Sequence, residues 1–459
     1  MALAAVLLIM GVLIYRRYLS DAPPEHHADV VAHFKYGSYG SEINGLPYPI
    51  WKALPEVCKD MLPGGWAQVG LYTEPGKDMP VGTSLRKYGV MRVGLNCAAC
   101  HSGVIDGSPD STDPKLMLGM PSPRFDSQRY GAFTQSCILS DQFTTDNVLA
   151  AIAKVGVDFP WYDGLFYRAF VIDKIKELAV AGKPGFAWMD TRPGWGPGRA
   201  DTANLFRMQL GQNPGGDKIA GPVDYPSLWN QGPRAKEGGG QHWDGDNDSF
   251  QERNYTSALA SGATEDSMDV AAINRISDWI ADMPAPKYPS PIDAAKAEQG
   301  KQVWIREKCH DCHDFGGGSA GKVTPLTEIG TDPGRVEAFT PGTVEAFKTL
   351  GVGKSWSLTH YRKTNGYLNV WTDGVWARSP YLHDGSVPTL YDLLLPPAQR
   401  PTEFFRGCST FDPKKVGWQC SAGSKYQVSQ PGNGNGGHLY GTQIPDEERW
   451  ALVEYMKTL

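Results

Sequence analysis

Two short cysteine–histidine runs constrain this chain more than any other feature. Cys97-Ala98-Ala99-Cys100-His101 and Cys309-His310-Asp311-Cys312-His313 both have the form C-x-x-C-H. With 8 cysteines and 10 histidines in 459 residues, roughly 0.003 such runs are expected by chance. Two thiols at this spacing can each add to a haem vinyl group, and the following histidine can bind the iron. The sequence therefore predicts two covalently attached c-type haems, with His101 and His313 as the proximal iron ligands.

The alternative for such a run is a zinc knuckle. Neither run has a second Cys/His pair close by that would complete four zinc ligands. The net charge of −6 and the absence of a basic tract also argue against a nucleic-acid partner.

Four cysteines remain outside the two runs, namely Cys58, Cys137, Cys408 and Cys420. An even remainder together with covalent haem indicates an oxidising compartment. Cys408 and Cys420 flank a short loop and are predicted to pair, which leaves Cys58 with Cys137 by elimination. The competing interpretation is four buried thiols.

The N-terminus carries an uninterrupted apolar run from Ala2 to Tyr15, followed by Arg16 and Arg17. As a helix it would be about 21 Å long, against roughly 30 Å of bilayer hydrocarbon. The basic pair would place the following chain in the cytoplasm, which conflicts with haem attachment outside it. We expect a membrane anchor or an uncleaved signal in residues 1–20, and a periplasmic location anchored to the cytoplasmic membrane.

The clearest boundary in the chain lies after the predicted helix 269–283, where Pro284, Pro286, Pro289 and Pro291 follow. We predict an N-terminal haem domain over 21–285 and a C-terminal cytochrome c-like haem domain over 286–459. A helix over 292–305 leads into Cys309, and another over 445–459 ends the chain, which is the plan of a small cytochrome c. The predicted fold class is mainly α, with two cytochrome c-like haem domains, long irregular loops and an N-terminal membrane anchor helix.

A run in the C-terminal half carries a family resemblance. Residues 380–390 read Pro-Tyr-Leu-His-Asp-Gly-Ser-Val-Pro-Thr-Leu, which resembles the P-Y-x-H-x-G-x-x-x-T-L motif of bacterial di-haem cytochrome c peroxidases. The longer run 374–390 and the following 394–397 look most like the di-haem rubber oxygenases. Trp243-Asp244-Gly245 is similar to the Trp-Asp-Gly of the peroxidases, whose tryptophan lies between the two haems.

The resemblance implies roles for individual residues. His438 stands where the peroxidases carry methionine and the rubber oxygenases histidine, so we expect it to be the sixth ligand of the second haem. His383 is the alternative ligand, although bracing of its loop is the expected role. Trp243 is expected to pass electrons between the haems, and Trp195 is a second candidate for that role. At the first haem Met120 is a candidate ligand, and Glu252 a candidate catalytic acid or base, with Glu265 as a second choice for that role.

The expected function is a periplasmic di-haem c-type cytochrome oxidoreductase, with peroxide or oxygen chemistry at the first haem and the second haem as an electron relay. The expected partners are hydrogen peroxide or oxygen, an organic substrate in the oxygenase variant, a redox protein or membrane oxidoreductase, and the membrane itself through the N-terminal helix. The alternative is a pure electron-transfer cytochrome with both irons six-coordinate. Calcium is an open cofactor candidate: Asp244, Asp246 and Asp248 alternate, but the EF-hand pattern fails at Ser249 and Tyr255.

Overall fold

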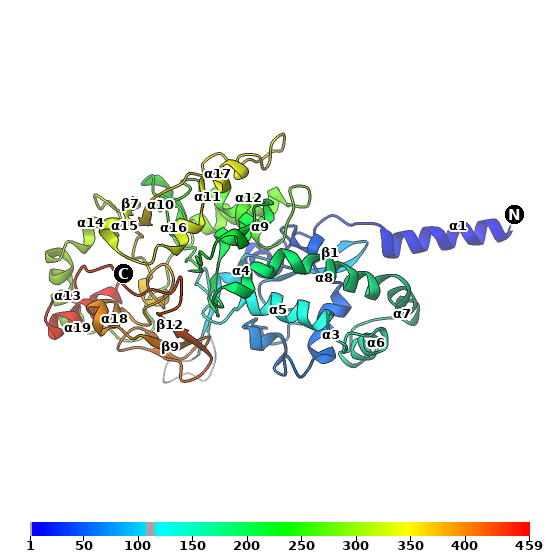
Figure 1. The fold of residues 1–459 in the computed structure, drawn as a ribbon, viewed down its shortest axis with the longest axis horizontal. Helices are drawn as coiled ribbons and strands as arrows, with labels where there is room; N and C mark the ends of the chain where they lie inside the picture. The colour runs from blue at the N-terminus through cyan, green and yellow to red at the C-terminus, as the bar shows by residue number, and fades with distance from the viewer. Residues whose placement is uncertain (1, 107–114) are drawn as a thin grey trace. The chain divides into compact units, whose positions relative to one another are not determined.

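The computed structural model describes residues 2–106 and 115–459, and the chain divides into two compact units (Figure 1). Unit 1 contains the chain up to 99 together with 130–184 and 255–276, and unit 2 contains 100–129, 185–254 and 277–459. Both units are discontinuous in sequence. The division falls inside the first C-x-x-C-H run, with Cys97 in unit 1 and Cys100 in unit 2. The boundaries predicted at 20/21 and 285/286 stay a prediction.

The N-terminal helix is shorter than a membrane anchor requires. Helix α1 spans Ala2–Ile14 and is followed by the π-helical turn η1 over Tyr15–Leu19, which contains Arg16 and Arg17. Its 13 residues give a length of about 20 Å, short of the hydrocarbon core. Within residues 2–106 and 115–459, no helix is long and apolar enough to cross a membrane. The predicted N-terminal anchor helix, and the membrane-anchored periplasmic location that rested on it, are therefore wrong.

Unit 1 is built from short helices and one hairpin. Helix α3 packs on α6, whose Val148, Ala151 and Ile152 are buried. The elements of unit 1 are α1, η1, α2 (Val30–Tyr36), η2 (Ser41–Asn44), α3 (Tyr48–Val57), η3 (Gly65–Val69), β1 (Thr83–Tyr88), β2 (Val90–Leu95), α6 (Thr145–Lys154), α7 (Trp161–Phe166) and η4 (Tyr167–Val171). Five helices cross the division between the units, namely α4 (Cys97–Cys100), α5 (Ser127–Ile138), α8 (Ile172–Phe186), α11 (Phe250–Ala260) and α12 (Val270–Ala281).

Unit 2 carries most of the short strands. In the described part of the chain the strands pair into six antiparallel two-stranded sheets and form no common sheet. The strands of unit 2 are β3 (Ser102–Ile105), β4 (Lys115–Leu118), β5 (Arg199–Ala200), β6 (Val223–Asp224), β7 (Val323–Pro325), β8 (Gly366–Leu368), β9 (Glu403–Arg406), β10 (Phe411–Asp412), β11 (Gly417–Trp418) and β12 (Ser424–Gln427). Its helices are η5 (Ala187–Thr191), α9 (Thr202–Gln209), η6 (Pro214–Gly216), α10 (Gln231–Lys236), α13 (Ala294–Arg306), α14 (Cys309–His313), α15 (Leu326–Ile329), α16 (Gly334–Ala338), α17 (Pro341–Phe347), η7 (Val375–Ala377), α18 (Leu390–Leu393), η8 (Pro397–Gln399) and α19 (Asp446–Met456).

Helices make up 43% of the structure, so loops and small hairpins account for much of each unit. The predicted mainly α fold with an anchor helix is corrected accordingly: the chain forms two loop-rich units, and the described residues include no membrane-spanning helix. A long irregular loop can stay ordered only when its backbone groups find partners, and unit 2 supplies those partners from buried side chains.

The predicted helix before the second motif and the predicted C-terminal helix are confirmed as α13 and α19. They pack against each other, and α18 lies beside α19 (Figure 1). At the crossing, a Cβ on Gly300 would lie 1.9 Å from the carbonyl oxygen of Ala451, so only glycine allows this approach. Trp304 of α13 contacts the rings of Tyr455 and His313, at centroid distances of 5.8 and 6.0 Å. The helix pair therefore packs directly against the second motif.

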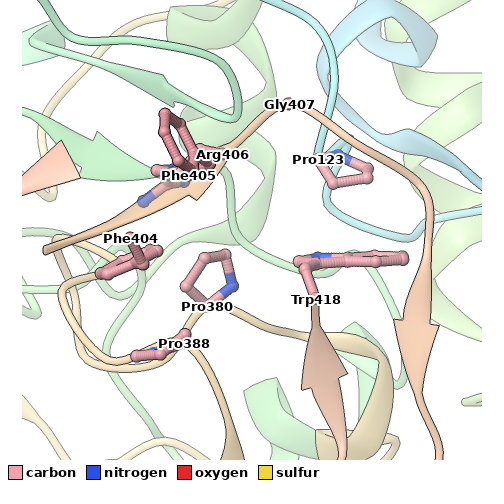
Figure 2. Close-up of a pocket in the computed structure, with 8 residues that line it drawn as sticks. All are labelled: Pro123, Pro380, Pro388, Phe404, Phe405, Arg406, Gly407 and Trp418. Atoms are coloured by element: carbon pink, nitrogen blue, oxygen red, sulfur yellow. The ribbon is translucent and has the colours of Figure 1, made fainter. Parts of the chain in front are cut away.

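The loop that carries His383 is held by an apolar cluster on one side. Pro380 lies between Phe404 and Trp418 at the edge of a small pocket (Figure 2). The pocket has a volume of about 10 Å³, which is room for roughly one water molecule. This part of unit 2 is therefore packed protein rather than a substrate site.

Buried charges also hold this loop. Arg406 donates to the Asp224 carboxylate and to the Gly385 carbonyl, and Arg199 donates to the Asp384 carbonyl. The Asp384 carboxylate itself accepts the Ser386 N–H through Oδ1, while its buried Oδ2 has no hydrogen-bond partner. Burial, which is the largest cause, and the nearby Asp332 raise the pKa of Asp384 to about 8.

The raised pKa predicts a pH-dependent stability. The folded protein binds the Asp384 proton more tightly than the unfolded chain, so ionisation opposes folding as the pH rises from 3.8, its ordinary pKa, to about 8. An Asp384→Asn variant cannot ionise there. The free energy of unfolding of the variant minus that of the parent, measured in urea at a series of pH values, should increase with pH up to about pH 8 and stay constant above it. Parallel pH profiles for parent and variant would contradict the assignment.

Both predicted disulfides are confirmed. Cys58 pairs with Cys137, which links the end of α3 to α5 across 79 residues, and Cys408 pairs with Cys420 across 12 residues. Closing the longer loop should contribute about 4.5 kcal/mol and the shorter one about 3 kcal/mol through the entropy of the unfolded chain.

These loop lengths predict the cost of removing each bridge. Replacement of Cys58 and Cys137 by alanine should lower the free energy of unfolding more than the same change at Cys408 and Cys420. Urea unfolding of the two double variants under non-reducing conditions measures the difference. A larger loss from the Cys408–Cys420 variant would refute the loop-length account.

Candidate haem sites

The second motif forms helix α14, directly after α13. His313 donates its Nδ1–H to the carbonyl oxygen of Val370 at 2.7 Å. This bond fixes the tautomer and leaves Nε2 free to bind a metal ion, as is usual for metal-binding histidines. Burial lowers the pKa of His313, so the ring is held in the neutral form that a metal requires.

His438 faces His313. The two ring centroids are 6.2 Å apart, and an iron held at about 2 Å from a nitrogen of each ring would separate the centroids by roughly 6.3 Å. His438 adopts a left-handed backbone conformation with φ +46°, and its Nδ1 is buried without a hydrogen-bond partner. Burial is the main cause that lowers the pKa of His438 to about 3. The pair therefore fits a haem iron with histidine on both faces.

A glycine brings the His438 segment into place. Gly437 has φ +70°, and a Cβ there would lie 2.3 Å from the carbonyl carbon of Gly330. The backbone N–H of His438 then donates to the Ile329 carbonyl at 2.8 Å. The glycine at 437 thus allows close contact between this segment and the chain at 329–330.

The first motif has the same proximal arrangement. His101 donates its Nδ1–H to the Pro226 carbonyl at 2.8 Å, and its ring contacts Tyr225 at a centroid distance of 6.4 Å. Burial, followed by the charge of Arg253, lowers the pKa of His101 to about 3. The ring is again neutral, with Nε2 available to iron.

Met120 is completely buried. Its side chain packs against the backbone of β3, because a Cβ on Gly103 would lie 2.6 Å from the Met120 sulfur. This contact favours a packing role, and ligation by Met120 stays a prediction.

Trp243 is connected to the segment that holds His101. The indole N–H of Trp243 donates to the Asp224 carbonyl at 2.7 Å. Two residues further along, the Pro226 carbonyl accepts the His101 bond. One extended segment of unit 2 therefore contacts both Trp243 and the first proximal histidine.

Trp243 is connected in the same way to the segment that holds His313. Its carbonyl oxygen accepts the Leu368 N–H at 2.8 Å. Two residues after Leu368, the Val370 carbonyl accepts the His313 bond. Trp243 is thus bracketed by the two segments that orient the two proximal histidines.

Glu252 is buried, and its carboxylate accepts hydrogen bonds from the Asn247 amide, the Thr359 N–H and hydroxyl, and the His360 N–H, at 2.9–3.1 Å. Both oxygens are engaged in holding the loop at 359–360. The contacts favour a structural role, and its predicted role in proton transfer remains without support from geometry.

His383 is buried and stacks on the Tyr367 ring at 3.9 Å and 18°. Its carbonyl accepts the Asp224 N–H at 2.8 Å. It braces its own loop against β6 and β8, in line with the role expected for it.

No sequence pattern indicated a role for two buried arginines, Arg253 and Arg400. Arg253 lies next to Glu252 in the sequence, and its positive charge helps to lower the pKa of His101. Arg400 follows the 394–397 run, and its positive charge helps to lower the pKa of His438. No spacing signal marks either residue, because their partners are distant in the sequence.

The two disulfides use the four cysteines outside the motifs, which leaves the motif thiols for bonds to haem. In the part of the chain that the structure describes, no group of three or more His, Cys, Asp or Glu side chains could hold a metal ion. Asp244 and Asp246 are instead paired with Arg335. The calcium candidate therefore has no site among these residues.

Comparisons with known proteins agree with a haem protein. The family model described as RoxA-like, cytochrome c-like matches residues 366–406. The chain is 24% identical over 513 residues to the uncharacterized protein y4iJ of Sinorhizobium fredii (strain NBRC 101917 / NGR234), covering 87% of this chain and 82% of that protein. It is 30% identical over 224 residues to the uncharacterized protein y4iM of the same strain, covering 43% and 49%. The family match spans β8, the His383 loop and Arg400, and it supports a RoxA-like c-type cytochrome with haem iron as its cofactor.

Proposed function

We propose that this chain is a di-haem c-type cytochrome oxidoreductase, with the second haem carrying electrons and peroxide or oxygen reacting at the first. The observation that carries the proposal is the facing pair His313 and His438, set at the separation that a shared iron requires. The repeated C-x-x-C-H run supports the number of haems.

Bound c-type haem supplies one-electron redox chemistry, and an open axial position on its iron supplies a site for peroxide or oxygen. The residues around each site would determine which haem transfers electrons and which reacts with peroxide or oxygen. His313 and His438 occupy both faces of the second site, which suits electron transfer and leaves no place for a substrate. A histidine pair also gives a lower potential than histidine with methionine, as a relay needs.

The role of Trp243 as the relay residue is supported by its two backbone contacts. Its indole N–H and its carbonyl connect it to the segments that orient His101 and His313. Both connections lie within unit 2, so they do not depend on how the two units are placed. An aromatic ring in this position shortens the path of an electron between the two proximal ligands.

At the first haem, His101 is oriented by Pro226, and the buried Arg253 contributes a positive charge near it. This positive charge acts on the proximal histidine. The family resemblance is the ground for proposing hydrogen peroxide, or oxygen with an organic substrate, as the species that reacts at the first haem. A redox protein would exchange electrons with the second haem.

The alternative is an electron-transfer cytochrome with both irons six-coordinate. It is favoured by the engagement of Glu252 in loop hydrogen bonds, which leaves the first site without the predicted acid or base. Carbon monoxide distinguishes the two, because it binds an open ferrous haem. Binding to one haem of the reduced parent supports the oxidoreductase, and no binding supports the carrier.

His438→Ala tests the division of roles. Loss of the ring should open the second haem, so the oxidised variant should gain a high-spin signal in electron paramagnetic resonance. His383→Ala is the matched control, because that histidine is buried in the same unit but stacks on Tyr367. It should keep the low-spin spectrum. The reverse outcome would transfer the ligand role to His383.

Trp243→Phe tests the relay. The variant should keep both haem spectra, since neither proximal histidine loses its backbone acceptor, while electron exchange between the haems slows. Flash photolysis of the carbon-monoxide form measures that exchange. Trp195→Phe changes the second candidate, a buried tryptophan of unit 2, and should leave the rate unchanged. Equal rates in Trp243→Phe and the parent would rule out the relay role.

A further inference from the structure

Arg400 is a buried cation with an unusual set of partners. It is 2% exposed and lies directly after η8. Its guanidinium donates to five backbone carbonyls, which belong to Leu393 (3.2 Å), Leu395 (3.0 Å), Asn435 (2.6 Å), Gly437 (3.0 Å) and His438 (3.1 Å). All five donors of the planar fork are thereby used.

The acceptors are all neutral. The buried arginines Arg406 and Arg335 pair with carboxylates, whereas Arg400 forms no ion pair among the residues that the structure describes. Burial lowers the pKa of Arg400 to about 10, so it remains charged at neutral pH. Unit 2 thus keeps an uncompensated positive charge in its interior, and a buried charge of this kind is costly.

The five carbonyls come from two segments. Leu393 and Leu395 lie at the end of α18, and the other three carbonyls belong to the 435–438 loop. Arg400 therefore ties the loop that ends in His438 to a helix that packs on α19.

His438 needs such support. A positive φ at a residue with a side chain is strained and persists only where the surroundings hold it. Ile329 holds the N–H of His438, and Arg400 holds its carbonyl together with that of Gly437. The two contacts fix the backbone on both sides of the Cα, and with it the direction of the imidazole.

We propose that Arg400 is the positioning residue of the second haem: it holds His438 opposite His313, and its charge raises the reduction potential of that haem. The inference rests on the proposed role of His438 as a ligand. A nearby fixed cation favours the ferrous state, because ferric haem carries one more positive charge. The guanidinium of Arg400 lies within hydrogen-bond distance of His438, 3.1 Å from its carbonyl oxygen.

The test uses three variants of the full-length haem protein. Arg400→Gln removes the charge and most donors, and Arg400→Lys keeps the charge without the planar fork. Arg449→Gln is the matched control, because Arg449 is also buried and donates to the carbonyls of Leu394 and Ile444, but pairs with Asp446 and does not contact the 435–438 loop. Electron paramagnetic resonance reports the spin state, and a spectroscopic redox titration reports the potential of each haem.

In Arg400→Gln, part of the second haem should become high-spin and bind carbon monoxide when reduced, and the potential of its low-spin fraction should fall. Arg400→Lys should return that potential toward the parent value while a high-spin fraction remains. Arg449→Gln should lower the urea midpoint of unfolding and leave both haem spectra as in the parent.

Parent-like spin state and potential in Arg400→Gln would refute the inference, as would the same high-spin signal in Arg449→Gln. His438→Ala, measured alongside, separates this failure from that of the proposed function. If His438→Ala opens the haem and Arg400→Gln does not, only the inference falls. If His438→Ala leaves the second haem low-spin, the ligand role of His438 and the inference fall together.

Discussion

The haem-binding part of this protein depends on one repeated hydrogen bond, from the Nδ1–H of a motif histidine to a backbone carbonyl. His101 uses Pro226 and His313 uses Val370. Each bond fixes the tautomer and points Nε2 at the iron. Each also ties its motif to a segment far away in sequence, and both of those segments contact Trp243. The same bonds that orient the two motif histidines therefore connect both motifs to the segments that contact Trp243.

Buried arginines stabilise the loops of unit 2, because its two-stranded sheets are too small to supply hydrogen-bond partners for the loop backbone. Arg199, Arg335, Arg400 and Arg406 are each at most 4% exposed, and together they bind carbonyls or carboxylates of the loops around His383, Trp243 and His438. Backbone groups in irregular segments must find partners when they are buried. A guanidinium with five donors satisfies several carbonyls at once, which explains how long loops remain precise enough to hold iron ligands.

Several features could be predicted because they are local or covalent. The spacing of the C-x-x-C-H runs predicts two haem attachments, and the short 408–420 loop made its disulfide the first choice. The apolar periodicity gave the helix seen as α12, and the patterns flanking the second motif gave α13 and α19. The N-terminal run was apolar enough to suggest an anchor, but its helix is too short to cross a bilayer. The lesson is that hydropathy without length does not define a membrane span.

The sequence by itself determined the positions of the two C-x-x-C-H runs, and with them the predicted haem attachments and proximal histidines. It also marked His438 as the residue to examine. The tertiary structure decided what these residues contact. The rings of His438 and His313 lie with their centroids 6.2 Å apart, and Trp243 is hydrogen-bonded to the two segments that orient the motif histidines. The Glu252 carboxylate accepts hydrogen bonds from the 359–360 loop. Arg400 donates to five backbone carbonyls. These outcomes depend on backbone groups, which every residue carries and no sequence pattern marks. Only the path of the folded chain determines which carbonyl meets which side chain.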